Sequence, residues 1–585
     1  MRTLTAVGLA AMLLANAVPA QADSAREYFV ARAARSPVPQ QLNDADRALY
    51  RALFSAIDAK DWPSAQALLA QRSDGLLTPL ATAEFYTAAD SPKATLEQIE
   101  QWFAKGSRLP EAAQLTRLAL TRGAVDLPAL PQEQAFYPRG SSPKRLRPRS
   151  VDDGTMPAEV RQAILDRITN DDPDGARALL DGVDALLSPE ARAEWRQRVA
   201  WSYYIGNRDP QALAIAQTAE GGRGAWVAEG DWAAGLAAWR MGDCATAGTY
   251  FERSAPSANN AELRSAAYYW ASRAAVRCRH PERSAQLLRT AAANDETLYG
   301  MLAVQQLGRK LPDLVTGADF SDADWNRLKG SDNVRVAIAL AEIGRDELAS
   351  EVLIHEAKIG NPKDFAALSR LARDLGLPQT QLYMAYNAPT GAVPDPASRY
   401  PAPKWTPRNG WQVDPALAFA HTLQESVFRY RAVSPANAQG LMQITPITVR
   451  ELAPRLGLSA SDVNIFDPAT NLAFGQQNLQ MLRSSAATQG KLPKIMAAYN
   501  AGLSPVARWN SQVNDQGDPL LYMESIPYWE TRGYVATVMR NYWMYERQAK
   551  APSATRVALA ENAWPMFPGA SQDTSGRVYL SADKN

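Results

Sequence analysis

Glu425 is the residue whose setting in this sequence best fits acid–base chemistry. It falls near the end of a predicted helix that opens with Asp414-Pro415, an N-cap residue followed by proline at the first helical position. Residues at helical spacing give this helix one apolar face: Leu417, Ala420, Leu423 and Val427. A Ser-Pro/Asn/Gly segment follows, in which helix is disfavoured. The pattern predicts one carboxylate on a rigid helix beside a loop of small polar residues, where a partly apolar cleft would raise its pKa.

This stretch contains no second acid or base. Between Glu425 and Gln443 there is no Asp, Glu, His or Cys, and the next carboxylate is Glu451, inside a helical run. Ordinary two-carboxylate glycosidases place a nucleophile or base opposite the acid. Here one carboxyl group would have to protonate a leaving oxygen and then take a proton from an internal nucleophile. The alternative is that Glu425 is a solvated residue on a helix surface, as most Glu residues are.

Composition limits the other classes of function. The 585 residues exceed one ordinary core, so we expect two or three domains. The 62 basic and 61 acidic residues leave a net charge of +1, which argues against a nucleic-acid partner, because such proteins carry a basic stripe. Three histidines do not cluster with the cysteines at ligand spacing, so we expect no metal and no other cofactor: His280, His355 and His421.

Residues 1–22 have the features of a cleavable secretory signal peptide. Arg2 supplies the positive charge, Leu4 to Leu14 is apolar, and Ala20-Gln21-Ala22 is a cleavage site. No later stretch is long and apolar enough to cross a membrane. Export would expose Cys244 and Cys278 to oxidant, so we expect one disulfide between adjacent helical hairpins, with two buried free thiols as the alternative.

Residues 23–318 are rich in Ala and Leu and favour helix after helix. Several helix junctions begin with an Asp that can act as an N-cap: Asp61, Asp172 and Asp243. A spacing near 34 residues is typical of stacked helix pairs, and its irregularity predicts an irregular α-superhelix of helical hairpins. Helical patterns continue over 319–400 and end in a Pro-rich connector from Pro389 to Pro407.

One segment, 136–156, interrupts this helical pattern and is rich in Pro, Gly and Ser. Its five basic residues are Arg139, Lys144, Arg145, Arg147 and Arg149. We expect a solvated linker, because charge runs usually stay hydrated. In the alternative, these cations meet acidic stem peptides or other anionic polymers.

A set of separate motifs extends over about 110 residues from Glu425 onward. They are Gln424-Glu425-Ser426, Ser434-Pro435, Gly440–Ile444, Ala497–Gly502, Glu524–Pro527 and Glu530–Val535. In this order and spacing they resemble the lysozyme-like catalytic domain of the soluble lytic transglycosylases. The resemblance implies a mainly α protein in three parts after the signal peptide. These are an α-superhelical domain over 23–318, U-shaped or closed into a ring, a small helical linker domain over 319–400 and a lysozyme-like domain over 401–585.

The resemblance also implies an activity and a site. Such enzymes are peptidoglycan lyases of the periplasm, which cleave the β-1,4 bond between N-acetylmuramic acid (MurNAc) and N-acetylglucosamine (GlcNAc) and leave a 1,6-anhydro ring. Glu425 matches their single catalytic acid and base. The positions that match substrate contacts are Ser434, Gln443, Tyr499 and Asn500, with Met442 shaping the cleft floor and Glu530 as a second groove acid. Glu530 could instead pair with a basic residue in its own helix. Thr445 departs from the family, since many members carry Met there.

Two other functions fit parts of the sequence. A goose-type lysozyme-like hydrolase would share the fold and the glutamate but deliver water to C1. A binding scaffold would combine the superhelix with an inactive lysozyme-like domain, although the intact motifs argue against it. For the enzyme we expect a monomer that acts on glycan strands and their stem peptides, with cell-wall synthases as candidate partners. Exo- or endo-action and stem-peptide preference do not follow from the sequence.

Overall fold

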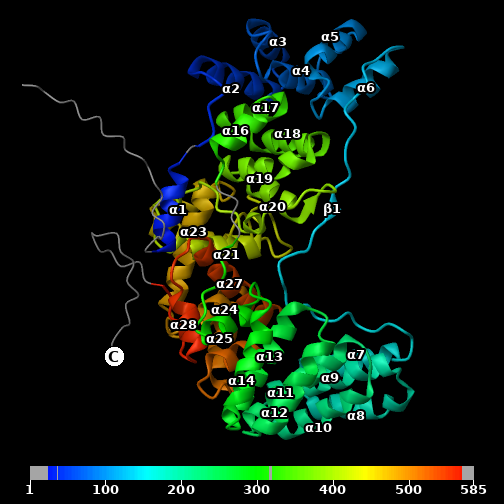
Figure 1. Ribbon diagram of the computed structural model, residues 1–585, viewed down its shortest axis with the longest axis vertical. Helices are drawn as coiled ribbons and strands as arrows, with labels where there is room; N and C mark the ends of the chain where they lie inside the picture. The colour runs from blue at the N-terminus through cyan, green and yellow to red at the C-terminus, as the bar shows by residue number, and fades with distance from the viewer. Residues whose placement is uncertain (1–23, 36, 315–318, 569–585) are drawn as a thin grey trace, which may run out of the picture.

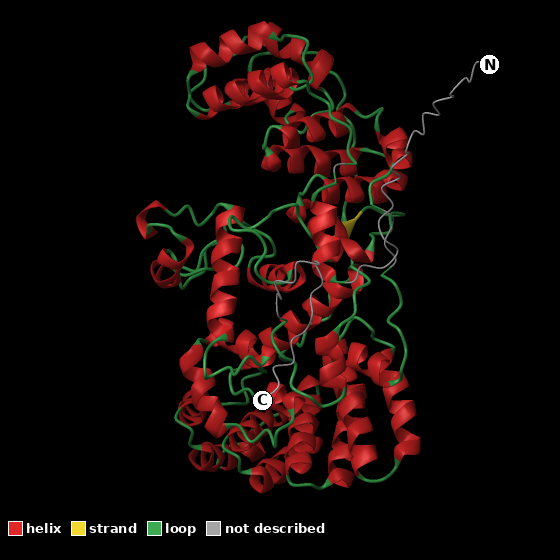
Figure 2. Cartoon of the chain, turned by 90° about the vertical axis from the view of Figure 1, so that its left-hand side faces the viewer, coloured by secondary structure: helices red, strands yellow, loops and turns green. Residues whose placement is uncertain are grey.

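The computed structural model describes residues 24–35, 37–314 and 319–568. This part of the chain consists mainly of α-helices, joined by short turns and a few long extended segments, and its only sheet has two strands (Figures 1 and 2). The expected mainly α class is therefore confirmed. The expected signal peptide at 1–22 lies outside the described residues. Within those residues, no helix has the length and apolar character needed to cross a membrane.

One group of helices combines two segments that lie far apart in the sequence. Its members from the first segment are α2 (Asp44–Asp58), α3 (Trp62–Gln71), α4 (Thr78–Thr87), α5 (Leu96–Gly106) and α6 (Ala112–Thr121). Those from the second are α16 (Asp322–Leu328), α17 (Asp332–Glu342), α18 (Asp346–Ile359), α19 (Phe365–Asp374) and α20 (Pro378–Tyr386). Both segments contribute to one hydrophobic core (Figure 1). The division into 23–318 and 319–400 stays a prediction, since α2–α6 share this core with α16–α20.

A second group, α7–α15, forms a stack of antiparallel helices in which each packs on the next. Its members are α7 (Ala158–Thr169), α8 (Pro173–Asp181), α9 (Pro189–Ile205), α10 (Asp209–Thr218), α11 (Ala225–Arg240), α12 (Cys244–Ser257), α13 (Ala261–Arg277), α14 (Pro281–Ala292) and α15 (Leu298–Gln306). Helices two apart also touch, as α9 does α11 and α13 does α15. Each helix therefore buries its apolar face only through its neighbours, as in other superhelical stacks.

Helix junctions in both groups share one local arrangement. At the junctions before α3, α8 and α12, the expected Asp caps accept a hydrogen bond from the backbone N–H three residues later. The residue just before each cap has a positive φ: Lys60, Asp171 and Gly242, at +58°, +55° and +82°. Each helix thus ends in a left-handed residue and the next begins with a capped N-terminus.

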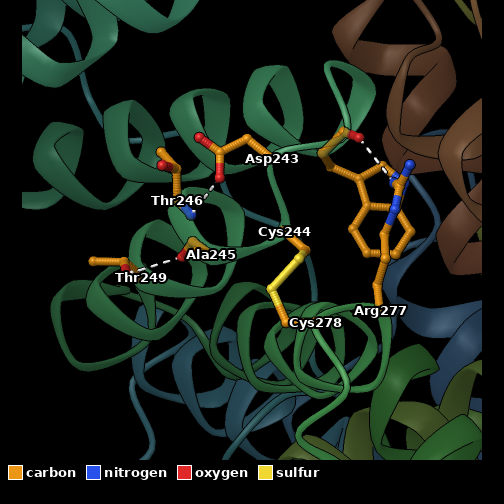
Figure 3. The surroundings of a disulfide bond; sticks show 8 residues. Asp243, Cys244, Ala245, Thr246, Thr249, Arg277 and Cys278 are labelled. Carbon is orange, nitrogen blue, oxygen red and sulfur yellow. Dashed lines mark hydrogen bonds between the residues drawn. A yellow bond between two sulfur atoms is a disulfide. The ribbon is translucent and has the colours of Figure 1, made fainter.

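The expected disulfide is present between Cys244 and Cys278, whose Cα atoms lie 5.6 Å apart. Cys244 opens α12 at the α11–α12 turn, and Cys278 ends α13 at the α13–α14 turn (Figure 3). The bond therefore joins the turns of two adjacent helical hairpins, as expected. The alternative of two free thiols is excluded.

The C-terminal helical domain lies between these two groups (Figure 1). It contains α21 (Pro415–Glu425), α22 (Pro446–Leu452), α23 (Pro468–Arg483), α24 (Leu492–Ala501), α25 (Leu503–Gln512), α26 (Pro519–Glu524), α27 (Trp529–Gln548) and α28 (Ala554–Ala560). The N-terminal helix α1 (Ala25–Ala33) packs on α21, with the ring of Phe29 5.6 Å from that of Phe419. These helices and the α7–α15 stack share one continuous core.

Short elements complete the described chain. The strands β1 (Tyr137–Pro138) and β2 (Asn387–Ala388) pair antiparallel. The 3-10 helices are η1 (Asp184–Leu186), η2 (Ala219–Gly221), η3 (Pro362–Asp364), η4 (Pro396–Arg399), η5 (Pro454–Leu456) and η6 (Ala460–Asp462). β1 belongs to the extended segment that runs from α6 to α7 and crosses from one helix group to the other (Figure 1).

The segment 136–156 is not the freely solvated linker that its composition favours. Arg145 donates to the buried Glu229 over 2.8 Å and lies over the ring of Trp232. Arg139 donates to the carbonyl of Pro389 next to β2. Several of its basic side chains form hydrogen bonds or ion pairs, because the segment runs along both helix groups. Its local sequence does not reveal these contacts.

Candidate active site

The helix that carries Glu425 is α21, with the N-terminus expected from the sequence. Asp414 caps it by accepting a hydrogen bond from the backbone N–H of Ala416 over 2.9 Å, and Pro415 occupies the first turn. Tyr542 of α27 donates to the other carboxylate oxygen of Asp414 over 3.1 Å. Burial raises the pKa of Asp414 to about 6. Since α21 packs along α27, the end of α21 is fixed against the longest helix of the domain.

α21 ends abruptly at Glu425. Val427 and Phe428 both take left-handed conformations, with φ of +53° and +59°, which is unusual for a β-branched residue such as Val427. Phe428 turns inward and is fully buried, whereas Val427 is 42% exposed. The expected apolar helix face is therefore wrong for Val427, which lies beyond the helix. The strained turn keeps Glu425 as the last helical residue.

The side chain of Glu425 is partly exposed. Burial raises its pKa to about 7, a hydrogen bond from Tyr534 lowers it, and the charge of Glu530 raises it. Tyr534 donates to Oε1 over 2.6 Å, and no group among the described residues donates to Oε2. In the protonated form the proton therefore belongs on Oε2. The carboxyl group can hold this proton near neutral pH, as a general acid must.

Glu425 is the end of a chain of hydrogen bonds that continues through Tyr534 to His421. The hydroxyl hydrogen of Tyr534 is directed to Glu425, so the Tyr534 oxygen accepts from Nδ1–H of His421, 2.8 Å away. His421 is fully buried, and burial lowers its pKa to about 3, so the imidazole is neutral. Its Nε2 is buried without a hydrogen-bond partner in the described structure.

Sequence reasoning did not assign a role to His421 or Tyr534. The available signal was spacing: His421 precedes Glu425 by four residues and Tyr534 follows Glu530 by four, which places each on a shared helix face. The pairing across 109 residues depends on the packing of α21 against α27, which no local pattern specifies.

The Ser434-Pro435 motif forms a tight turn beside the end of α21. The Ser434 hydroxyl accepts from the backbone N–H of Ala438 over 3.0 Å, and the backbone N–H of Ser434 donates to the carbonyl of Ala438. Gln443, at φ +50°, donates through Nε2 to the carbonyl of Gly440 over 2.8 Å. Both predicted contact residues thus hold the shape of the 434–444 loop through their own hydrogen bonds.

Met442 forms part of the floor under this loop. Its side chain is fully buried against Gly475 of α23, where a Cβ would lie 2.1 Å from the Met442 sulfur. The hydroxyl of Tyr499 donates to the Met442 carbonyl over 2.8 Å, and the Tyr499 ring lies 4.6 Å from that of His421. This placement fits the expected floor role of Met442 and puts Tyr499 between the loop and the hydrogen-bond chain.

Asn471 of α23 was not predicted, although it holds the same loop. Its side chain is fully buried, accepts from the backbone N–H of Met442 and donates to the carbonyls of Gln439 and Ile465. Gly440 passes so close to it that a Cβ would lie 2.2 Å from the Asn471 amide nitrogen. This contact, with a φ of +75°, explains the glycine that opens the Gly440–Ile444 motif.

The remaining predicted residues lie at the start of α27 and the end of α24. Asn500 accepts a hydrogen bond from the Thr531 hydroxyl over 2.6 Å. Glu530 is exposed and forms no ion pair among the described residues, so an intrahelical partner is not observed. Its charge raises the pKa of Glu425, which places Glu530 near that carboxyl group.

Thr445, the departure from the family pattern, has a structural role. It caps α22, and its hydroxyl accepts from the backbone N–H of Thr448 over 3.2 Å. A threonine can supply this cap whereas methionine cannot. No group of three or more His, Cys, Asp or Glu side chains in the described chain could hold a metal ion.

Comparison with known proteins identifies the domain that holds this site. The family model described as "Transglycosylase SLT domain" matches residues 404–521. Residues 404–521 are therefore similar to transglycosylase SLT domains. The expected resemblance to the soluble lytic transglycosylases is thereby confirmed, and the SLT segment contains Glu425, the 434–444 loop and Tyr499.

Two curated proteins are similar to parts of this chain in sequence. A putative soluble lytic murein transglycosylase from Haemophilus influenzae is 27% identical over 268 residues, which cover 44% of this chain and 43% of the relative. The soluble lytic murein transglycosylase of Escherichia coli K12 is 32% identical over 155 residues, or 26% of this chain and 24% of the relative. The matched region thus spans less than half of the length of these relatives.

Solved structures extend the likeness in fold to most of the chain. The 70-kDa soluble lytic transglycosylase from E. coli is similar with a TM-score of 0.53 and 16% identity, over 90% of this chain and 99% of that one. A complex of the 70-kDa soluble lytic transglycosylase with bulgecin A gives a TM-score of 0.59 with 18% identity and the same coverage. The expected arrangement of a helical superhelix with a lysozyme-like domain is therefore confirmed at the level of fold.

Proposed function

We propose that this protein is a peptidoglycan lytic transglycosylase. It cleaves the β-1,4 bond between MurNAc and GlcNAc, with Glu425 as the only catalytic acid and base. The observation that carries the proposal is the partly exposed carboxyl group of Glu425 at the end of α21, with its pKa raised to about 7 and with no hydrogen-bond donor to Oε2 among the described residues. The match of residues 404–521 to the transglycosylase SLT family supports the same reaction.

In the first step Glu425 acts as the acid. The proton on Oε2 moves to the glycosidic oxygen as the bond to the MurNAc C1 breaks, which releases the GlcNAc side with a free hydroxyl. Positive charge develops at C1, and the N-acetyl group of the same MurNAc stabilises it. Glu425 becomes a carboxylate in this step, and the Tyr534 hydroxyl stabilises that charge by its hydrogen bond to Oε1.

In the second step Glu425 acts as the base. Its carboxylate takes the proton of the MurNAc C6 hydroxyl while that oxygen attacks C1. The 1,6-anhydro ring forms and the carboxyl group is restored with its proton, so no external base is consumed. Ser434, Gln443, Tyr499 and Asn500 contact the sugar chain, and Glu530 lines the groove.

The proposed substrate determines where the enzyme acts and which molecules it meets. Its substrates are glycan strands with their stem peptides. The protein acts as a monomer in the periplasm, to which the signal peptide at residues 1–22 directs it. Cell-wall synthases remain candidate protein partners.

The experiment compares purified wild-type protein with Glu425→Gln in a zymogram on purified peptidoglycan. We expect clearing by the wild type and loss of at least about a hundredfold in activity in the variant, because the acid is essential to both steps. Glu451→Gln is the matched control, since Glu451 is an exposed carboxylate on α22 outside the site. Comparable clearing by Glu425→Gln would refute the single-carboxylate mechanism, and a wild type that clears nothing would refute the function.

A further inference from the structure

A cleft lies between the α7–α15 stack and the C-terminal helical domain, beside the start of α27. Its volume is about 670 Å³, within the range of small-ligand sites. One wall comes from α7, α9 and α11, and the other from the end of α24 and residues 527–532. Arg147, from the extended segment between α6 and α7, also lines it. We call it the Arg147 cleft.

Aromatic rings and guanidinium groups alternate along this cleft. Arg147 lies between Trp226 of α11 and Trp529 of α27, at 5.7 and 5.6 Å from the two rings. Arg532 lies 4.0 Å from the ring of Trp201 of α9 and 4.8 Å from that of Trp529. The rings hold each guanidinium plane in place, so the donors are preorganised.

The positive charge of the cleft is only partly compensated. Arg198 is paired with the buried Glu194 at 2.7 Å. Arg532 donates only to the carbonyls of Glu524 and Ile526, and among the described residues neither Arg147 nor Arg532 forms an ion pair. The pKa of Arg147 is lowered first by burial and then by the nearby charge of Arg198, while the charges of Glu194 and Glu229 raise it, so these two carboxylates compensate the cleft in part.

The Arg147 cleft shares two predicted site residues with the candidate active site. Asn500 and Glu530 line it, and the charge of Glu530 acts on the carboxyl group of Glu425. A glycan strand placed at Glu425 would therefore carry its substituents toward these arginines. Tyr528, 48% exposed at the rim, adds another aromatic face.

From this arrangement we infer that the Arg147 cleft binds the carboxylates of the stem peptide carried by the strand at Glu425. A guanidinium group donates two parallel hydrogen bonds to a carboxylate, and the indole rings cover the apolar parts of a short peptide. The superhelix would thus contribute directly to substrate binding. The inference rests on the proposed function, because it takes its ligand from the proposed substrate.

The test is a calorimetric titration of the full-length protein with a GlcNAc–MurNAc disaccharide that carries a tripeptide. This fragment lacks the MurNAc–GlcNAc bond and stays intact. The reference ligand is the same fragment with its peptide carboxyl groups converted to amides. We expect the wild type to bind the carboxylate form about fivefold more tightly than the amide form, as for a partly exposed ion pair.

Two variants locate the effect. Arg147→Gln should lose the preference for the carboxylate form, whereas Arg149→Gln should keep it, since Arg149 carries the same charge on the same segment but does not line the cleft. Equal binding of both ligands by the wild type, or an unchanged preference in Arg147→Gln, would overturn the inference. The zymogram and the titration test the two proposals separately. If the protein cleaves peptidoglycan but binds both ligands equally, only the proposed peptide site is refuted. If it prefers the carboxylate ligand but does not cleave peptidoglycan, only the proposed transglycosylase activity is refuted.

Discussion

The phenol of Tyr534 donates a hydrogen bond of 2.6 Å to Oε1 of Glu425, although 109 residues separate them in the chain. This contact has two consequences for the proposed acid. It stabilises the carboxylate that forms in the first step, and it leaves Oε2 to carry the proton. Burial opposes the first effect and is the larger of the two, so the pKa of Glu425 stays raised, at about 7.

The pH dependence of the rate follows from this balance. The first step requires the protonated carboxyl group, so kcat/KM should be high below the pKa of Glu425 and fall as pH rises through about 7. Tyr534→Phe removes the donor that lowers this pKa. We therefore expect the falling limb to move to higher pH and the plateau to drop about tenfold, since the carboxyl group loses its orientation.

The measurement is a pH profile of kcat/KM on soluble glycan strands for the wild type and Tyr534→Phe. Tyr137→Phe is the control, because Tyr137 is an exposed tyrosine in β1 far from the SLT domain in sequence. A limb that stays at the wild-type pH in Tyr534→Phe would mean that the tyrosine does not tune Glu425.

His421 should act on the reaction only through Tyr534. Its Nδ1–H occupies the Tyr534 oxygen, which directs the hydroxyl hydrogen to Glu425. His421→Leu removes that donor while keeping an apolar side chain in a fully buried site. We expect kcat to fall about tenfold with KM little changed, because a positioning residue affects the acid rather than sugar binding.

A purely structural role of His421 would give a different result. His421→Gln can restore a hydrogen-bond donor to Tyr534 and should recover part of the lost kcat. His280→Leu is the control, because it makes the same substitution at an exposed histidine. If His421→Leu lowers activity only in proportion to the loss of folded protein, measured by circular dichroism, the positioning role is wrong.

The Cys244–Cys278 bond should stabilise the superhelix without affecting the site. It closes a loop of 34 residues, for which the chain-entropy model gives about 3–4 kcal/mol. The double variant Cys244→Ser/Cys278→Ser should unfold at lower urea concentration than the oxidised wild type. The wild type with reductant should match the variant, and zymogram activity at 25 °C should not change. Equal unfolding midpoints with and without reductant would contradict this.

The sequence predicted those features of the fold that depend on local chemistry. The Asp-Pro start of α21 and the Asp caps of the hairpin turns follow from residue types at short spacing, and the disulfide was expected because the sequence has only two cysteines and a predicted export signal. Glu425 could be singled out because no other acid lies near it in the chain. The turn after α21 could not be foreseen, because nothing in Val427-Phe428 requires left-handed backbone.

The unforeseen parts of the site depend on long-range packing. Asn471 holds the 439–442 loop from α23, and Tyr534 reaches Glu425 from α27. The basic segment 136–156 was expected to be solvated, but it spans two helix groups and places Arg147 over two tryptophans. Such contacts join residues tens to hundreds of positions apart, which composition and periodicity do not encode.

The fate of water at C1 tests the central claim most directly. The proposed mechanism closes the 1,6-anhydro ring with the C6 hydroxyl and uses Glu425 as the base, whereas a hydrolase would need a base for water, for which Glu530, whose charge acts on Glu425, is the nearby candidate. Digestion of purified sacculi in heavy-oxygen water, followed by mass analysis of the new MurNAc ends, separates ring closure from hydrolysis. We expect MurNAc ends with a 1,6-anhydro ring, which are lighter by one water than hydrolysed ends and contain no heavy oxygen. Predominant heavy-oxygen incorporation by the wild-type protein would make it a lysozyme-type hydrolase and contradict the account.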